Sequence, residues 1–410
     1  MRRLIHRLHV WLGVAAGLAL LLLCLSGSLA VFRVEIGQWA AGGLPASEPG
    51  CQLDADQALH RLRGQLGDDP SPIRRLSLPA LTGGHLELRL ANGRRAQADV
   101  CGRPLSGLRT QVADFLVNLH TRLFLGKSGR WVVGLFGLLM LLSLASGLLA
   151  HRRILRQWFT LRRGRSLRLT GSDAHKLLGL WILPFHLLTA ASGAWLGLAS
   201  LLPVPVIKGV KAAAQAPYER PLGLQAMLDQ AGERLPGLQP VFFDFFPERG
   251  QVSLRGNLPG ELVQRYSAEL LFDGQRGDLL GVHDPRRLRG LAWWNQAMMP
   301  LHLGDWAGVS LRWLYALLGL GSAALIWLGL WLWGDRRRHV AGALLPRGRW
   351  AGLGLRGASA ALLASLLLPW LLWRWAGRGF ELGASAWLWS AAAGMLVFVV
   401  VGRFRGARVR

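Results

Sequence analysis

The sequence predicts a mainly α-helical membrane protein, with six transmembrane helices and two extramembrane modules of mixed α+β structure. Hydrophobic residues make up 51% of the 410 positions and charged residues only 17%, whereas about 25% of residues are charged in typical soluble proteins. Six apolar segments reach the ~20 residues that a helix needs to cross the hydrocarbon core. The net charge of +25 gathers on the short polar segments between them.

The six apolar segments are separated by two long and two short connections. The first is longer than the apolar part of a signal peptide and no small-residue cleavage site follows it, so we expect it to stay as an anchor. The expected spans lie within residues 1–32, 131–150, 177–202, 306–333, 353–375 and 384–401. The expected connections are the long segments 33–130 and 203–305, the short segments 151–176 and 334–352, and the tail 402–410.

The distribution of basic residues orients these spans. Residues 33–130 hold 13 Lys and Arg against 9 acids, and residues 203–305 hold 11 of each. The segments on the opposite side hold 21 Lys and Arg against two acids, and they are 1–9, 151–176, 334–356 and 402–410. By the positive-inside rule, both termini are cytoplasmic and the two long segments are external. The positive charge therefore meets anionic lipid and does not indicate a nucleic-acid partner.

The first four spans repeat one another in pairs. At an offset of 166 residues, LHVWLGVAAG matches AHKLLGLWIL and aligns His9 with His175. At an offset of 182 residues, LHTRLFLG matches LHLGDWAG and aligns His120 with His302. Each half is therefore a span, an external module and a second span. Parallel repeats of this kind imply a pseudo-twofold axis along the membrane normal.

Both external segments predict a helix followed by short strands, from apolar residues at helical spacing and then alternating ones. The expected helices are 54–66 and 222–234, and the expected strands are 73–78, 85–90, 241–246, 252–255 and 266–272. Four aromatic residues in the second module are expected to form a strand that packs on its helix, with a ligand-binding surface as the alternative. They are Phe242, Phe243, Phe245 and Phe246.

Two of the three cysteines, Cys51 and Cys101, fall in the first external segment. They can form a disulfide in an oxidising compartment. Two unpaired thiols are the alternative, because the sequence does not give the separation of the two residues. Cys24 lies in the first predicted span, where we expect it to be a small core residue. No Cys-x-x-Cys-His motif occurs, which excludes covalent c-type haem.

Six of the eleven histidines lie in or beside the predicted spans, where an ionisable side chain predicts a function. One falls near mid-membrane, three gather at the cytoplasmic ends of the first three spans, and two lie at the external mouth. Histidines from different helices at two depths are the arrangement that two b-type haems require, with two imidazoles on each iron. The histidine near mid-membrane is His186. Those at the cytoplasmic ends are His9, His151 and His175, and those at the external mouth are His120 and His302.

The internal repeat selects the pairs. It predicts His9 with His175 as the axial ligands of a cytoplasmic-side haem. It predicts His120 with His302 as the axial ligands of an external-side haem.

Alternatives to these pairs stay open. His151 is a rival at the inner site, and His186 can complete a site in place of a histidine at a helix end. Any of the six can instead cap helix carbonyls, and His186 can act in a proton relay. A zinc site is disfavoured because supporting Cys and carboxylate ligands are absent near both clusters. Gly13 and Gly179 leave room for a flat macrocycle, although small residues also serve close helix packing.

The chain resembles the PepSY-associated transmembrane family in four stretches, which are HRLHVWLGVAAG, LHTRLFLGKSGRWVVGLFG, DAHKLLGLWILPFHLL and LHLGDWAG. The resemblance covers about residues 1–340, and the external segments are similar to divergent PepSY domains. It implies a bacterial inner-membrane protein of the kind induced by iron limitation. Some members of the family are dihaem reductases, which reduce ferric siderophores in the periplasm and release ferrous iron. The six histidines named above match the family's pattern.

The resemblance also bears on the source of electrons. Some relatives carry a C-terminal flavin reductase domain, and here the predicted spans 353–375 and 384–401 stand in its place. Electrons are therefore expected from a separate donor, either a quinol or a cytoplasmic reductase.

The leading hypothesis is an inner-membrane oxidoreductase that holds two b haems and passes electrons to a periplasmic ferric siderophore. The first alternative is a non-enzymatic, membrane-tethered PepSY protein with a binding or regulatory role, whose histidines are structural. The second is a small-solute transporter, favoured by the repeat and by His186. The absence of acidic residues from the predicted spans, and of an obvious broken helix at mid-membrane, weighs against transport.

Overall fold

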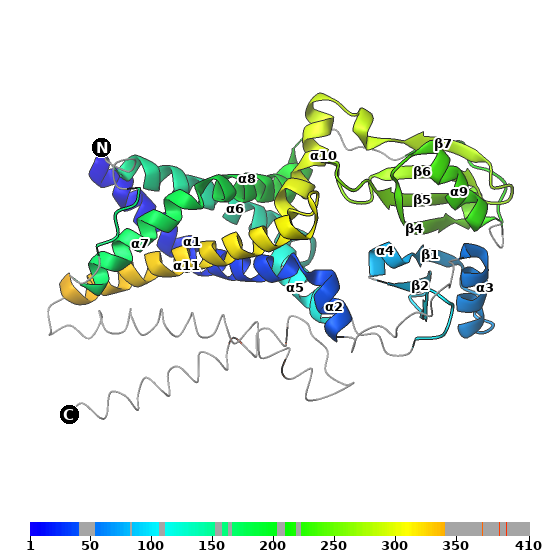
Figure 1. Ribbon diagram of the computed structural model, residues 1–410, viewed down its shortest axis with the longest axis horizontal. Helices are drawn as coiled ribbons and strands as arrows, with labels where there is room; N and C mark the ends of the chain where they lie inside the picture. The colour runs from blue at the N-terminus through cyan, green and yellow to red at the C-terminus, as the bar shows by residue number, and fades with distance from the viewer. Residues whose placement is uncertain are drawn as a thin grey trace. The chain divides into compact units, whose positions relative to one another are not determined.

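The computed structural model describes most of the chain up to residue 340 (Figure 1). By internal contacts the chain divides into a helical unit, 1–33, 111–202 and 310–410, and a sheet unit, 34–110 and 203–309. The predicted spans 353–375 and 384–401 lie outside the described residues, apart from three single positions. The described residues are 1–40, 54–82, 84–105, 111–151, 158–162, 166–202, 210–218, 223–340, Leu371, Ser385 and Ala391.

Long apolar helices build the helical unit, which confirms a helical, multi-pass membrane protein. Within the described residues, three helices are long and apolar enough to cross a membrane, or four if a bent pair forms one span. The three are α1 (Arg2–Ala30), α6 (Gly126–Ala150) and α11 (Gly308–Val340), and the pair is α7 (Leu167–Trp181) with α8 (Leu183–Leu198). The shorter helix α5 (Gln111–Arg122) and the 3₁₀ turn η2 (Ala199–Leu201) also belong to this unit, whereas α2 (Arg33–Ala40) lies in the sheet unit apart from its first residue.

Small residues let these helices approach closely. α1 and α11 lie side by side (Figure 1), with Gly17 against the side chain of Leu330. α6 and α8 meet at Gly134 and Gly197, where a Cβ on either glycine would collide with the backbone of the other helix. Close backbone approach at small residues is the usual packing mode of membrane helices, because lipid provides no hydrophobic driving force between them.

The predicted span 177–202 is a broken helix. α7 and α8 meet at Ile182 and bend by 65°. The physical cause is Pro184, which lies at the start of α8, cannot donate a helical N–H and clashes with the preceding turn. The expectation that no span is broken was therefore wrong. α7 also extends back to Leu167, so it contains Asp173, which we had placed in a cytoplasmic loop.

The sheet unit is built on one antiparallel sheet of seven strands, in the order β3-β2-β1-β4-β5-β6-β7. The two external segments, expected as separate modules, thus share a single sheet and join at β1 and β4. β3 and β7 were not predicted. The strands are β1 (Ile73–Ser77), β2 (His85–Leu90), β3 (Arg95–Asp99), β4 (Gln239–Phe246), β5 (Gln251–Asn257), β6 (Ala268–Asp273) and β7 (Leu279–His283).

The junction of the two modules combines an ion pair with apolar packing. Leu76 pairs with Phe243 across β1 and β4, and both side chains are buried. On the other face, the Arg75 guanidinium donates to both carboxylate oxygens of Asp244, at 2.6 and 2.9 Å. Its Cζ also lies 3.9 Å from the centre of the Phe242 ring. A bidentate, stacked arginine of this kind fixes the register of the two strands.

Helices α3 (Ala55–Gln65) and α9 (Leu224–Arg234) cover one face of the sheet and close its core. The Asp56 carboxylate accepts hydrogen bonds from the N–H groups of Leu224 and Gln225, at 2.9 and 3.0 Å. An acidic residue of one module therefore caps the helix of the other. Phe243 and Phe245 pack in this core as predicted, and Phe242 lies on the opposite face.

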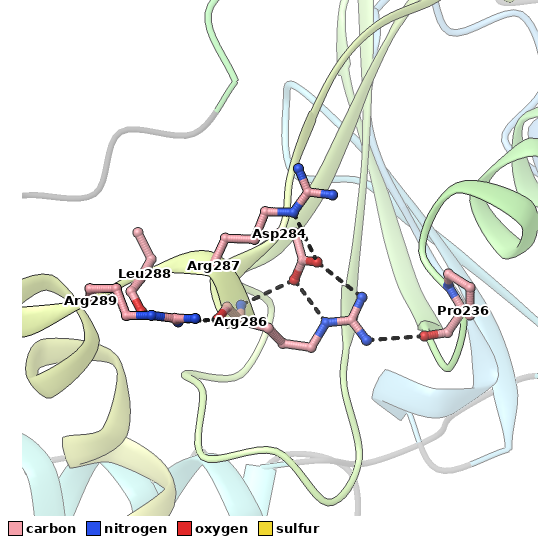
Figure 2. A network of polar contacts seen from close by, with 6 residues as sticks. All are labelled: Pro236, Asp284, Arg286, Arg287, Leu288 and Arg289. Carbon is pink, nitrogen blue, oxygen red and sulfur yellow. Dashed lines mark hydrogen bonds and ion pairs between the residues drawn. The ribbon is translucent and has the colours of Figure 1, made fainter.

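The connection from β7 to α10 (Gly290–Leu303) is fixed by a polar network (Figure 2). The Asp284 carboxylate accepts from the guanidinium of Arg286 at 2.9 and 3.0 Å, and Arg287 lies within 3.8 Å. Arg286 also donates to the carbonyl of Pro236. Hydrogen bonds and charge from Arg286 hold the pKa of Asp284 below its usual value, although burial acts to raise it. The remaining short elements are α4 (Pro79–Thr82), η3 (Pro247–Arg249) and η4 (Pro285–Arg287).

The cysteines differ in state. Cys101 is disulfide-bonded, and Cys24 is a free thiol in α1. The predicted partner of Cys101, Cys51, lies outside the described residues.

Candidate functional site

The helical unit contains a cavity of about 450 Å³ lined by α1, α6, α7, α8 and α11. This volume is within the range of pockets that hold small organic ligands and cofactors. Much of the wall is glycine and aliphatic side chain. Four of the six predicted site residues line it, and they are His9, His151, His175 and His186.

His9 and His175 oppose each other across this cavity. His9 lies on α1 and His175 on α7, and their ring centroids are 6.3 Å apart with an angle of 62° between the planes. Two imidazoles on opposite sides of one metal ion, bonded at about 2 Å, have ring centres about 6 Å apart. Among the described residues, no group of three or more His, Cys, Asp or Glu gathers as a metal site. The pair offers two ligands, the number that a haem leaves open.

Hydrogen bonds set the tautomer of both rings. The Nδ1 of His9 lies 2.9 Å from the carbonyl oxygen of Ser143 on α6, and the Nδ1 of His175 lies 3.0 Å from that of Leu325 on α11. Because a carbonyl oxygen only accepts, Nδ1 must carry the hydrogen and Nε2 keeps its lone pair. A ligating histidine in proteins is held in this way by its second nitrogen.

A glycine makes each of these contacts sterically possible. Gly147 follows Ser143 by four residues, and Gly329 follows Leu325 by four residues. A Cβ at Gly147 would lie 3.0 Å from the Cε1 of His9, and one at Gly329 would lie 2.9 Å from that of His175. A helical carbonyl is already bonded to the N–H four residues on. An imidazole can share that carbonyl only where the donor residue has no side chain.

His120 on α5 is held in the same manner. Its Nδ1 lies 3.0 Å from the carbonyl oxygen of Leu23 on α1. A Cβ at Gly27, again four residues on, would lie 2.7 Å from its Cε1. His302 lies near the end of α10, in the sheet unit. The outer pair of His120 with His302 therefore stays a prediction.

His186 is fully buried and has the opposite orientation. Its Nε2 lies 2.8 Å from the hydroxyl of Ser322, and that hydroxyl donates to the carbonyl of Leu318 at 2.8 Å. The hydroxyl must therefore accept from His186, so Nε2 carries the hydrogen. Nδ1 of His186 has no hydrogen-bond partner among the described residues. As a rival axial ligand, His186 would have to give up the bond to Ser322 or use Nδ1.

Basic residues gather around the cavity. From the sequence, the arginines of the short segments were expected only to orient the spans. Arg168, Lys176 and Arg336 line the cavity, and no carboxylate lies among its described lining residues. Lys176 is paired with the buried Asp173 at 2.7 Å. Arg168 lies 3.9 Å from the carboxylate of Asp335, so among the described residues Arg336 is the lining cation that forms no ion pair with a carboxylate, and it suits a carboxylate at one edge of a ligand. His151, the residue after α6, also lines the cavity, but the close ring contact joins His9 and His175.

The two glycines singled out in the sequence both line the cavity. A Cβ at Gly13 would meet no protein atom within 4 Å, and one at Gly179 would make ordinary contact with Leu325 at 3.6 Å. The helix surface at Gly13 is thus open to the cavity, as expected beside a flat ligand.

Comparison with known proteins identifies a membrane-protein family whose model covers most of the chain. The family model for the PepSY-associated TM region matches residues 6–336. A relative from Pseudomonas aeruginosa strain PAO1, "Uncharacterized protein PA4219", is 34% identical over 339 residues, which cover 72% of this chain and 82% of that protein.

Proposed function

Since this chain belongs to the PepSY-associated TM region family, we propose that its helical unit is the scaffold of a haem b oxidoreductase. In this proposal the protein lies in a bacterial inner membrane with both termini in the cytoplasm. It passes one electron at a time to a periplasmic ferric siderophore, and each electron reduces one ferric ion to the ferrous state. The donor is a quinol or a cytoplasmic reductase.

The observation that carries the proposal is the inner histidine pair. His9 and His175 come from different helices, oppose each other at 6.3 Å, and each keeps Nε2 free because a carbonyl holds Nδ1. A histidine that only bonded a helix carbonyl would need the same clearance at Gly147 and Gly329, but it would not need an opposing imidazole across a cavity of this volume.

The residues of the chain then have distinct tasks. Haem b, when bound, supplies one-electron transfer. His9 and His175 would hold it from both faces, and the carbonyls of Ser143 and Leu325 keep the two rings oriented. The surrounding aliphatic wall would exclude water, and Arg336, which also lines the cavity, would stabilise a carboxylate at the ligand's edge.

A second haem on the external side is part of the proposal. The carbonyl and glycine that hold His120 repeat the arrangement at the inner pair. The internal repeat is supported instead by the inner pair, because Ser143 with Gly147 and Leu325 with Gly329 are separated by the same offset of 182 residues. His302 is proposed as the other ligand.

The test is an optical spectrum of the full-length protein, purified in detergent from cells with ample haem. We expect reduced α and Soret bands of low-spin b haem. His9→Ala and His175→Ala should each lose the inner haem, whereas His60→Ala, an exposed histidine on α3, should keep the full spectrum. Absence of bands from the wild-type protein would rule out the redox function and leave the non-enzymatic PepSY role.

Transport is the second candidate, and the broken α7–α8 pair favours it. Discontinuous helices and buried acids mark substrate and ion sites in many transporters. Asp173, fully buried on α7, is bound by Arg162 at 2.8 Å and by Lys176 at 2.7 Å. If Asp173 and its two cationic partners couple the transport of a small solute, Asp173→Asn should abolish solute uptake in proteoliposomes and leave the haem content unchanged. Equal uptake by Asp173→Asn and the wild type would exclude that role.

A further inference from the structure

A second hollow lies on the sheet unit, and three arginines line it. It opens at the end of the β2–β3 hairpin, with a volume of about 420 Å³. Arg74 comes from β1, Arg89 from β2 and Arg95 from β3, and all three are exposed. Within the described part of the chain, none of the three forms an ion pair with a carboxylate. We call this set the arginine hollow.

A β-bulge turns the first of these arginines toward the other two. Ile73 pairs with Leu90 and Arg75 pairs with Arg89, so Arg74 is the extra residue on β1. A bulge re-aims the side chain of its extra residue and is common beside functional sites. The Cζ of Arg74 lies 5.9 Å from the ring centre of Phe246, which braces the side chain on that face.

The other two arginines are directly opposite each other in the hairpin. Arg89 pairs with Arg95, so both side chains leave the same face of the sheet. Like charges in this relation destabilise a strand pair. The nearest acid on that face along β2, Glu87, accepts a hydrogen bond from Gln97 at 2.8 Å. A repulsive pair with no compensating acid indicates that an external anion supplies the missing charge.

The arginines directly beside two members of the hollow are, in contrast, each bound by a carboxylate. Of the pair Arg74-Arg75, Arg75 is bound by Asp244. Of the pair Arg94-Arg95, Arg94 is bound by Asp69 at 2.7 Å. Hydrogen bonds, first from the backbone of Ser71, hold the pKa of Asp69 well below its usual range, so it stays ionised. Asp69 also accepts from the side chain of Asn92 in the hairpin turn and so fixes its tip.

From this arrangement we propose that the arginine hollow binds an oxyanion group of the phosphate class, with two or more negative charges. Guanidinium groups match phosphate oxygens with paired N–H donors and stay charged at every physiological pH. Three of them converge from three adjacent strands on one small open hollow. The phosphate can belong to a soluble phosphate ester or to a lipid headgroup, and the two sources are separated by experiment.

The experiment is calorimetric titration of the detergent-purified full chain with pyrophosphate, in a phosphate-free buffer at low salt. We expect saturable binding at one site per chain, weakened about tenfold or more in Arg89→Gln and in Arg95→Gln, because each loses a charge-assisted donor pair. The matched control is Arg276→Gln, which removes an exposed arginine from the turn between β6 and β7. It should bind as the wild type does. Equal binding by the wild type and the double variant Arg89→Gln/Arg95→Gln would overturn the proposal.

Two further measurements complete the test. In nanodiscs of phosphatidylcholine, added phosphatidic acid should compete with pyrophosphate if the source is a headgroup, and should leave it unaffected if the source is soluble. Hydrogen exchange separates binding from a merely structural effect. Pyrophosphate should protect the amides of β2 and β3 in the wild type and not in the double variant. Without any anion, these amides should be more protected in Arg95→Gln than in the wild type. Because the measured quantity is anion binding, a negative result would leave the haem proposal unaffected.

Discussion

Gly147 lies against the imidazole of His9 so closely that a Cβ in its place would come within 3.0 Å of the ring. The His9 Nδ1 needs that clearance to reach the carbonyl of Ser143. Gly147→Ala should therefore displace His9 and lower the haem-to-protein ratio, measured as the pyridine haemochrome. Gly232→Ala on α9, where a Cβ meets nothing within 4 Å, should leave the ratio unchanged. If Gly147→Ala kept its full haem content, His9 would not be a haem ligand.

Gly13→Ala tests whether the cavity is filled by a ligand. The new methyl group meets no protein atom within 4 Å, and alanine favours a helix over glycine by about 1 kcal/mol. Without haem, the variant should therefore be at least as stable as the wild type, whereas its haem binding should weaken. Thermal unfolding of the haem-free protein and haem titration check the two halves. A variant that binds haem with unchanged affinity would show that the ligand does not lie against α1 at this point.

His186 should prove to be a structural histidine. Ser322→Ala removes the acceptor of its Nε2–H, and an unsatisfied buried donor costs about 1–3 kcal/mol. We expect a lower unfolding temperature for Ser322→Ala and an α band of unchanged position and height. Loss of one haem in His186→Ala, with His9→Ala still loaded, would assign His186 as a ligand instead.

The ion pair of Arg75 with Asp244 should hold the two halves of the sheet unit together. Both partners are partly exposed, with 40% and 16% of their side-chain surface accessible, so we expect a coupling free energy of about 1 kcal/mol. A double-mutant cycle with Arg75→Ala and Asp244→Ala checks it, read by hydrogen exchange of β1 and β4. Arg249→Ala, at an exposed arginine near the end of β4, is the control. Additive effects of the two substitutions would show that the pair contributes nothing to the junction.

The sheet unit should lose stability in mild acid because of His85. Burial lowers the pKa of this histidine, and the charge of Glu87 opposes the shift only in part. The unfolded chain then binds a proton below its pKa of about 6.5 while the folded chain does not. Stability is therefore complete above that pH and falls as the pH drops toward the folded pKa. Hydrogen exchange of β2 at pH 5 and pH 7.5 should show this loss in the wild type and not in His85→Phe.

Local patterns predicted the parts of this molecule better than their assembly. Helices α3 and α9 and strand β2 follow from the spacing of apolar residues. The junction of β1 with β4 does not, because Arg75 and Asp244 are 169 residues apart and strand alternation carries no information about partners. The bend at Ile182 could not be predicted from local patterns either, because proline is tolerated in membrane helices and its effect depends on neighbouring helices.

The candidate site shows the same division. The repeat placed His9 opposite His175, because registered positions in related helices meet at one depth. It did not reveal the glycine under each ring, although a Gly four residues after the accepting carbonyl recurs at Gly147, Gly329 and Gly27. That signal is readable only once the facing helix is known, because glycine is abundant throughout the chain.

The shared sheet has a consequence for how the protein is made. β1 has no partner on the β4 side until a strand about 170 residues later has been synthesised, and chains elongate at about 5–20 residues per second. The β1 edge is therefore exposed for on the order of ten seconds or more while two further membrane helices insert. An unpaired edge is a site for wrong pairing. Arg74 and Arg75, two adjacent charges on that edge, keep it soluble until Asp244 arrives and the second half closes the first.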